Sequence, residues 1–145
     1  HLLTPLAAMS GDTPEAGVML PSDHISSQDN PRVPGLGLGL AKIMSDAKKP
    51  GAFVHRVTLP KRRVVPPHSH PDDRTYTALS GTWYIGWGDQ YDPEQLTALP
   101  AGSFYTEPAG VTHFIATPDV EAVVQVTGTG STAATFGDTA HAPKK

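Results

Sequence analysis

Apolar and polar positions alternate with a period of two along the middle of the chain, which predicts strands that bury one face. The clearest run is residues 53–59, one face of which carries Phe53, His55, Val57 and Leu59. Pro60 ends this run, because proline lacks the amide proton that a strand needs for its ladder.

Other runs bounded by turn signals predict further strands. They cover residues 64–70, 74–79, 82–87, 104–106, 113–116 and 122–126, with a weaker alternation of leucine and glycine at 36–40. Ser80-Gly81 predicts a tight hairpin turn between two of them. Strands separated by turns every eight to twelve residues, roughly, are typical of an all-β sandwich or barrel.

One short helix is expected within this pattern. Asp92 suits an N-cap, Pro93 the first helical position and Gln95 the third. We expect one or two turns that end near residues 99–100.

The chain has 145 residues, with 14 Gly and 15 Pro, so one domain of short strands and turns is expected. The strand pattern covers residues 35–130, which we predict to form a barrel. Residues 1–34 are rich in Pro, Ser, Asp and Gly and predict an N-terminal arm that can pack on the barrel as an edge strand. Residues 131–145 are mostly small and polar and predict a C-terminal tail.

Charge and composition argue against several classes of protein. The net charge is −3, and the one basic cluster, residues 61–63, is too short to predict a nucleic-acid partner. The absence of cysteine excludes disulfides, thiolate metal ligands and a cysteine nucleophile. No apolar stretch is long enough to span a membrane. The mostly apolar residues 2–9 favour an exported, periplasmic location over a frayed cytosolic N-terminus.

The candidate chemistry begins with His68 and His70, which are separated by one residue. On a strand both imidazoles point to the same side, and Pro66-Pro67 stiffens the approach to them. His113 lies on another predicted strand, after a Pro-Ala-Gly turn. Three neutral imidazoles that converge would hold one divalent ion of iron, manganese, nickel, copper or zinc.

Around these histidines the chain resembles the two motifs of the cupin superfamily. The first motif is Gly, five residues, His-x-His, three or four residues, Glu, six residues and Gly. Here it consists of Arg62, His68-Ser69-His70, Arg74 and Gly81. The second motif is Gly, five residues, Pro-x-Gly, two residues, His, three residues and Asn. Here it consists of Gly102, Pro108-Ala109-Gly110, His113 and Thr117.

This resemblance implies an all-β double-stranded β-helix, the jelly-roll or cupin barrel, with one metal ion on His68, His70 and His113. It also implies a homodimer, since cupins of this size commonly pair through edge strands and N-terminal arms. The family includes dioxygenases, isomerases, decarboxylases, epimerases, sugar-binding regulators and storage proteins. The motifs therefore indicate the fold more strongly than the reaction.

Arg74 occupies the position of the family's metal-binding glutamate, and a guanidinium cannot bind a metal ion. At about 5 Å from a divalent ion it would be repelled by roughly 6 to 7 kcal/mol at an effective dielectric constant near 20. In one arrangement Arg74 pairs with Asp72, Asp73 or Glu107, which leaves a three-histidine site similar to that of the acetylacetone dioxygenase branch. In a second it binds an anionic substrate group inside the cavity. In a third no metal binds, and the histidines hydrogen-bond a ligand or one another. We expect the first in the resting protein.

Glu107 has four roles open to it: a fourth metal ligand, a general base, the partner of Arg74, or a carboxylate at the mouth of the barrel. His55 would face inward, as a core histidine or as a group that moves protons. Tyr76 shares the strand parity of Arg74 and would place its hydroxyl in the cavity.

Phe104 and Tyr105 are candidates to wall a small apolar substrate pocket. Taken together, the residues predict a metal-dependent, oxygenase-like enzyme for a small organic substrate, with an anionic group oriented by Arg74. The alternative, which the missing glutamate favours, is a non-catalytic cupin that carries or senses a ligand or metal.

Overall fold

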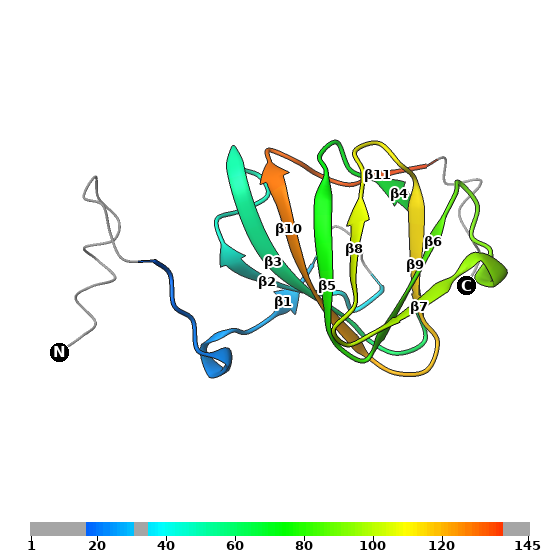
Figure 1. Cartoon of the computed structure of the whole chain (residues 1–145), viewed down its shortest axis with the longest axis horizontal. Helices are drawn as coiled ribbons and strands as arrows, with labels where there is room; N and C mark the ends of the chain where they lie inside the picture. The colour runs from blue at the N-terminus through cyan, green and yellow to red at the C-terminus, as the bar shows by residue number, and fades with distance from the viewer. Residues whose placement is uncertain (1–16, 31–34, 138–145) are drawn as a thin grey trace.

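Antiparallel strands make up most of this computed structural model, which describes residues 17–30 and 35–137 (Figure 1). The strands are β1 (Gln28–Asp29), β2 (Gly39–Met44), β3 (Gly51–Leu59), β4 (Arg63–Ser69), β5 (Arg74–Ser80), β6 (Thr82–Trp87), β7 (Thr97–Pro100), β8 (Phe104–Glu107), β9 (His113–Thr117), β10 (Ala122–Gly130) and β11 (Thr135–Phe136). Two single 3₁₀ turns accompany them, η1 (Ser22–His24) and η2 (Pro93–Gln95).

The strands form two sheets that face each other. One has the order β1-β2-β3-β10-β5-β8 and the other β11-β4-β9-β6-β7. Every strand pair is antiparallel, and neighbours in a sheet are often distant in sequence, as when β10 lies between β3 and β5. The predicted all-β jelly-roll architecture is confirmed.

The core lies between the sheets and follows the alternation that the sequence predicts. On β3, Phe53 and Leu59 are fully buried, and on β10 Val124 and Val126 are buried while Gln125 between them is more exposed. Side chains of the second sheet, such as Ile115 on β9, complete this core from the opposite side. Burial of apolar area on both inner faces holds the sheets together.

The chain turns tightly at Gly81 between β5 and β6, as predicted, but the two strands do not pair, so the predicted hairpin is wrong. The φ of +68° at Gly81 favours glycine, and a Cβ atom there would collide with the carbonyl oxygen of Glu121. The short turn places β5 and β6 in different sheets, so the chain crosses from one face of the barrel to the other at this point.

The predicted helix after residue 92 is wrong in its length. Asp92 does act as a cap, since its Oδ1 accepts a hydrogen bond from the amide of Glu94 at 3.0 Å, but only a single 3₁₀ turn follows. Residues 97–100 form β7 instead, which pairs with β6. The ladder bonds to β6 outweigh the weak local preference of so short a helix.

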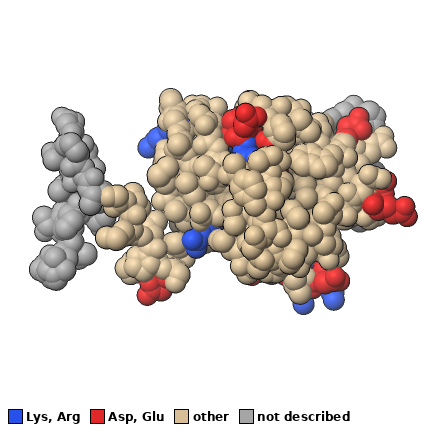
Figure 2. All heavy atoms as spheres, viewed as in Figure 1, with Lys and Arg blue, Asp and Glu red and all other residues tan. Residues whose placement is uncertain are grey.

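Two short strands extend the sheets beyond residues 39–130. β1 pairs with β2 at one edge, and β11 pairs with β4 at an edge of the other sheet. Among the described residues, no helix is long and apolar enough to cross a membrane. Residues 2–9, on which the expectation of export rests, lie outside the described part of the chain. On the face shown in Figure 2, Lys and Arg side chains are scattered rather than gathered in one patch.

Candidate metal centre

The structure brings His68, His70 and His113 together inside the barrel. His68 and His113 are directly opposite each other on β4 and β9, and His70 follows the end of β4. All three are buried, with exposures of 7%, 8% and 1%. One ring nitrogen from each lies within 4.8 Å of the others, so the three form a group that could hold a metal ion.

The hydrogen bonds of these imidazoles fix which nitrogen faces the centre. His68 Nδ1 lies 2.8 Å from the Pro66 carbonyl oxygen, His113 Nδ1 lies 3.0 Å from that of Val111, and His70 Nδ1 lies 3.2 Å from that of Ala133. A carbonyl oxygen only accepts, so each Nδ1 must carry the proton. Each Nε2 of a neutral ring then keeps its lone pair, which is the form and orientation that a metal ion requires.

Burial keeps two of the rings neutral. It lowers the pKa of His68 from 6.5 to about 3, and the nearby His113 adds to this effect. It lowers the pKa of His70 from 6.5 to about 4, with Arg74 as the next contributor. Both imidazoles are therefore uncharged near neutral pH and available as ligands.

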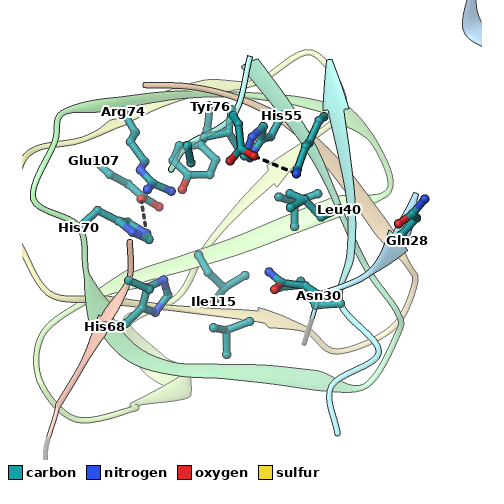
Figure 3. A pocket seen from close by; sticks show the side chains of 18 of the residues that line it. Gln28, Asn30, Leu40, His55, His68, His70, Arg74, Tyr76, Glu107 and Ile115 are labelled. Atoms are coloured by element: carbon teal, nitrogen blue, oxygen red, sulfur yellow. Dashed lines mark hydrogen bonds and ion pairs between the residues drawn. The ribbon is translucent and has the colours of Figure 1, made fainter. Parts of the chain in front are cut away.

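Glu107, at the end of β8, lies beside the histidines and is 2% exposed. Its Oε1 is 3.1 Å from His113 Nε2 and 3.8 Å from His70 Nε2, the contact marked in Figure 3. Its Oε2 accepts a hydrogen bond from the Tyr105 hydroxyl at 2.8 Å. Burial raises the pKa of Glu107, and the hydrogen bond from the Tyr105 hydroxyl acts against this and favours the carboxylate form.

Arg74 turns toward Asp72. Its Nε donates to Asp72 Oδ1 at 3.3 Å, and its Nη2 donates to Thr132 Oγ1 at the same distance. The guanidinium carbon also lies 5.4 Å from the centre of the Phe53 ring. Of the three arrangements considered from the sequence, the structure displays the pairing with Asp72. Asp73 instead accepts a hydrogen bond from the Ala109 amide at 2.7 Å, joining the two motifs.

A cavity of about 660 Å³ adjoins the centre (Figure 3). Of the residues singled out from the sequence, its lining includes His55, His68, His70, Arg74, Tyr76 and Glu107. His55 and Tyr76 are each 6% exposed. Burial, reinforced by the charge of Glu107, raises the pKa of the Tyr76 hydroxyl well above 10. Tyr76 therefore remains a hydrogen-bond donor.

Phe104 and Tyr105 do not line the cavity. Phe104 is 61% exposed on the outer face of β8, so its predicted place in a substrate pocket is corrected: Tyr105 and Glu107 take the inner positions of this strand. Tyr105 lies behind the wall, with its ring stacked on Tyr76 at 4.8 Å and its hydroxyl accepting a hydrogen bond from Trp83 Nε1 at 2.9 Å.

Residues near the two ends of the described chain also line the cavity, and the sequence did not indicate this. Gln28 and Asn30, from the predicted arm, line the cavity, and so does Phe136 on β11. Phe136 also packs against His68, with 5.1 Å between the ring centres. No period-two signal exists in segments as short as β1 and β11, so pattern alone could not have found them.

Solved structures of cupins share this architecture. No protein-family model and no curated protein matches the sequence. The polyketide cyclase RemF from Streptomyces resistomycificus superposes with a TM-score of 0.69 at 14% identity, over 85% of this chain and 87% of that chain. A sugar phosphate isomerase of the cupin superfamily from Silicibacter pomeroyi gives a TM-score of 0.63 at 19% identity, over 83% of this chain and 82% of that chain. The DMSP lyase DddQ from Ruegeria pomeroyi also gives 0.63, at 17% identity, over 91% and 76%. The predicted cupin fold is confirmed, and at these identities the likeness shows the fold alone.

Proposed function

We propose that this chain is an enzyme that binds one divalent metal ion on His68, His70 and His113 and acts on a small organic molecule in the adjoining cavity. The observation that carries the proposal is the set of three Nδ1–H···O=C hydrogen bonds, which leave an Nε2 lone pair on each of three buried imidazoles that lie side by side. Such outer hydrogen bonds are a regular feature of metal-binding histidines. A purely structural role would not need all three rings in the same tautomer beside a cavity.

The bound ion would act as a Lewis acid on a substrate oxygen. The chain's own groups would do the rest. The Tyr76 hydroxyl would donate a hydrogen bond to a substrate oxygen, because its raised pKa keeps it protonated. His55, which also lines the cavity, would move a proton, and Arg74 would orient an anionic group of the substrate.

For the reaction we propose oxygenation, which the resemblance to three-histidine cupins suggests. The neighbours in fold are named as a cyclase, an isomerase and a lyase, so the assay must separate oxidative from non-oxidative turnover. Metal-loaded protein would be incubated with a panel of small keto acids, hydroxy acids and diketones, in air and under nitrogen. Consumption that requires oxygen supports oxygenation. Consumption under nitrogen replaces it with a non-oxidative reaction, and tight binding without turnover supports the sensor alternative.

Metal binding is tested by removing one imidazole at a time. His68→Ala, His70→Ala and His113→Ala should each lose most of the bound metal, because each removes one of three ligands and leaves the barrel folded. His24→Ala, whose side chain is 66% exposed on η1, is the matched control and should retain it. Metal content would be measured by elemental analysis of protein purified without an affinity tag, with circular dichroism as the check on folding. Full occupancy in the His113→Ala protein would remove that residue from the site.

We also propose that the chain works as a homodimer. The exposed apolar residues Val18, Met19 and Leu20 of the N-terminal arm support this proposal.

A further inference from the structure

We propose that Glu107 is a fourth ligand of the metal, and that it replaces, from the neighbouring strand, the carboxylate that the cupin motif places at position 74. The inference rests on the proposed metal site and adds a residue and a coordination mode to it. Glu107 belongs to the second motif region, outside the positions that the family's pattern assigns to ligands.

The strand register explains how a carboxylate at position 107 can replace one at position 74. Arg74 on β5 and Glu107 on β8 are directly opposite each other in an antiparallel pair. Residues in such a pair project from the same face of the sheet with their Cβ atoms about 5 Å apart. A carboxylate on either residue can therefore reach the same volume beside the histidines. In this chain the acidic group is on β8, and the residue on β5 is a cation that pairs with Asp72.

The distances suit two ligands of one ion. Two donors that each lie about 2.1 Å from one metal ion cannot be more than about 4.2 Å apart, and neighbouring donors lie about 3.0–3.4 Å apart. Glu107 Oε1 is 3.1 Å from His113 Nε2 and 3.8 Å from His70 Nε2. Within the described part of the chain, neither Glu107 Oε1 nor His113 Nε2 makes a hydrogen bond, although both are fully buried.

A cation between that pair of atoms would stabilise both of them. The His113 proton is on Nδ1, where it faces the Val111 carbonyl, so Nε2 presents a lone pair to a carboxylate oxygen. Two buried acceptors facing each other repel, and leaving both without a partner is unfavourable. A divalent ion bound to both atoms would remove this penalty.

A chain of hydrogen bonds aims the carboxylate. Trp83 Nε1 can only donate, so the Tyr105 oxygen accepts from it at 2.9 Å. The Tyr105 proton is then directed to Glu107 Oε2, at 2.8 Å. With Oε2 engaged in this way, Oε1 is the oxygen presented to the histidines. Tyr105 and Trp83 are thus positioning residues for Glu107.

The first test measures cobalt binding to the whole chain. Glu107→Gln keeps the size and removes the charge, and should weaken Co²⁺ affinity by about tenfold or more, as well as changing the visible absorption of the bound ion. Glu121→Gln, at an exposed position, is the control and should match the wild type. Tyr105→Phe should weaken binding less than Glu107→Gln. An unchanged affinity and spectrum in Glu107→Gln would overturn the proposal.

The second test exchanges the two positions. In the Arg74→Glu, Glu107→Gln double variant, the carboxylate is restored on β5, and part of the lost affinity should return. A double variant no better than Glu107→Gln would overturn the equivalence of the two positions.

A third measurement needs no variant, in case Glu107→Gln does not fold. The infrared difference between metal-loaded and metal-free wild-type protein should contain carboxylate bands, and a spectrum without them would contradict a glutamate ligand. If instead the wild-type protein binds no Co²⁺ at all, the metal site itself fails. If it binds through the histidines but ignores Glu107→Gln, only the present inference fails.

Discussion

At the scale of single residues, the centre depends on how each imidazole is held. His68 and His113 use the carbonyl oxygen two residues earlier on their own segment, so their tautomers are set locally. His70 uses the carbonyl of Ala133, far away in the sequence. Two imidazoles are therefore arranged by β4 and by β9 with the turn before it, and the third depends on the C-terminal segment.

The buried histidines make the metal-free protein sensitive to acid. The pKa values of His68 and His70 in the folded protein are about 3 and about 4, below the ordinary 6.5. Between these values and pH 6.5 the two imidazoles bind protons in the unfolded chain but not in the folded chain. The free energy of unfolding therefore falls as pH drops below 6.5, and these two groups do not affect it above that pH. Each histidine contributes up to about 1.4 kcal/mol per pH unit.

We expect the free energy of unfolding in urea, measured with a chelator present, to fall steadily between pH 6.5 and 4.5. His68→Gln should reduce this slope by about half, and the exposed His24→Gln should leave it unchanged. A free energy that stays flat over this range would show that the two imidazoles titrate normally in the folded protein.

Single residues also mark the limit of prediction from sequence. The three histidines follow from the spacing of the motifs, because a fixed turn and a fixed strand parity bring them together. The orientation of Arg74 does not follow from strand parity, which points it inward, and the pairing with Asp72 agrees instead with the expectation from charge repulsion. For β8, alternation alone could not tell which of Phe104 and Tyr105 faces inward. The register with β5 settles that question.

At the scale of elements, the segment 131–137 closes one side of the centre. Thr132 hydrogen-bonds both Arg74 and Asp72, Ala133 holds His70, and β11 pairs with β4. Asp72 also accepts from the amide of Thr129 at 3.1 Å. One carboxylate therefore connects the loop after β4, the first residue of β5 and the C-terminal segment.

Asp72→Asn should loosen this connection. The change removes the charge that Arg74 and the two threonines bind, and should lower the free energy of unfolding by about 1–3 kcal/mol. Hydrogen–deuterium exchange in peptides covering residues 129–136 should become faster than in the wild type, and exchange in β6 should not change. Asp119→Asn, at an exposed position, is the control. Unchanged exchange at 129–136 would show that β11 pairing alone holds the segment.

The strands could be predicted from the sequence where apolar and polar positions alternate along them or where turn residues bound them. The strands from β3 to β6 and from β8 to β10 are long enough for alternation or for bounding turns to indicate them. β7 was missed because the N-cap at Asp92 predicted a longer helix, whereas pairing with β6 makes residues 97–100 a strand. β1 and β11 have two residues each and are defined only by the strands beside them.

At the scale of the whole molecule, the described part of the N-terminal arm leaves the barrel before β1 and reaches away from it (Figure 1). It carries three consecutive apolar residues, Val18, Met19 and Leu20, with exposures of 56%, 85% and 41%. Adjacent apolar side chains left in water are unfavourable, and such patches usually mark an interface. A second copy of the chain is the partner that we propose covers them, which agrees with the dimer that the sequence resemblance implies.

A dimer built in this way should depend on the apolar side chains of the arm. Met19→Asp places a charge in the proposed interface and should shift the protein toward the monomer, because burying an unpaired carboxylate is costly. Ser22→Asp adds the same charge nearby, at an exposed polar position, and should leave the mass unchanged. The molar mass would be measured by light scattering during size-exclusion chromatography over a tenfold range of concentration. A wild-type protein that is a monomer throughout this range, or a Met19→Asp protein that remains dimeric, would rule out the arm as the interface.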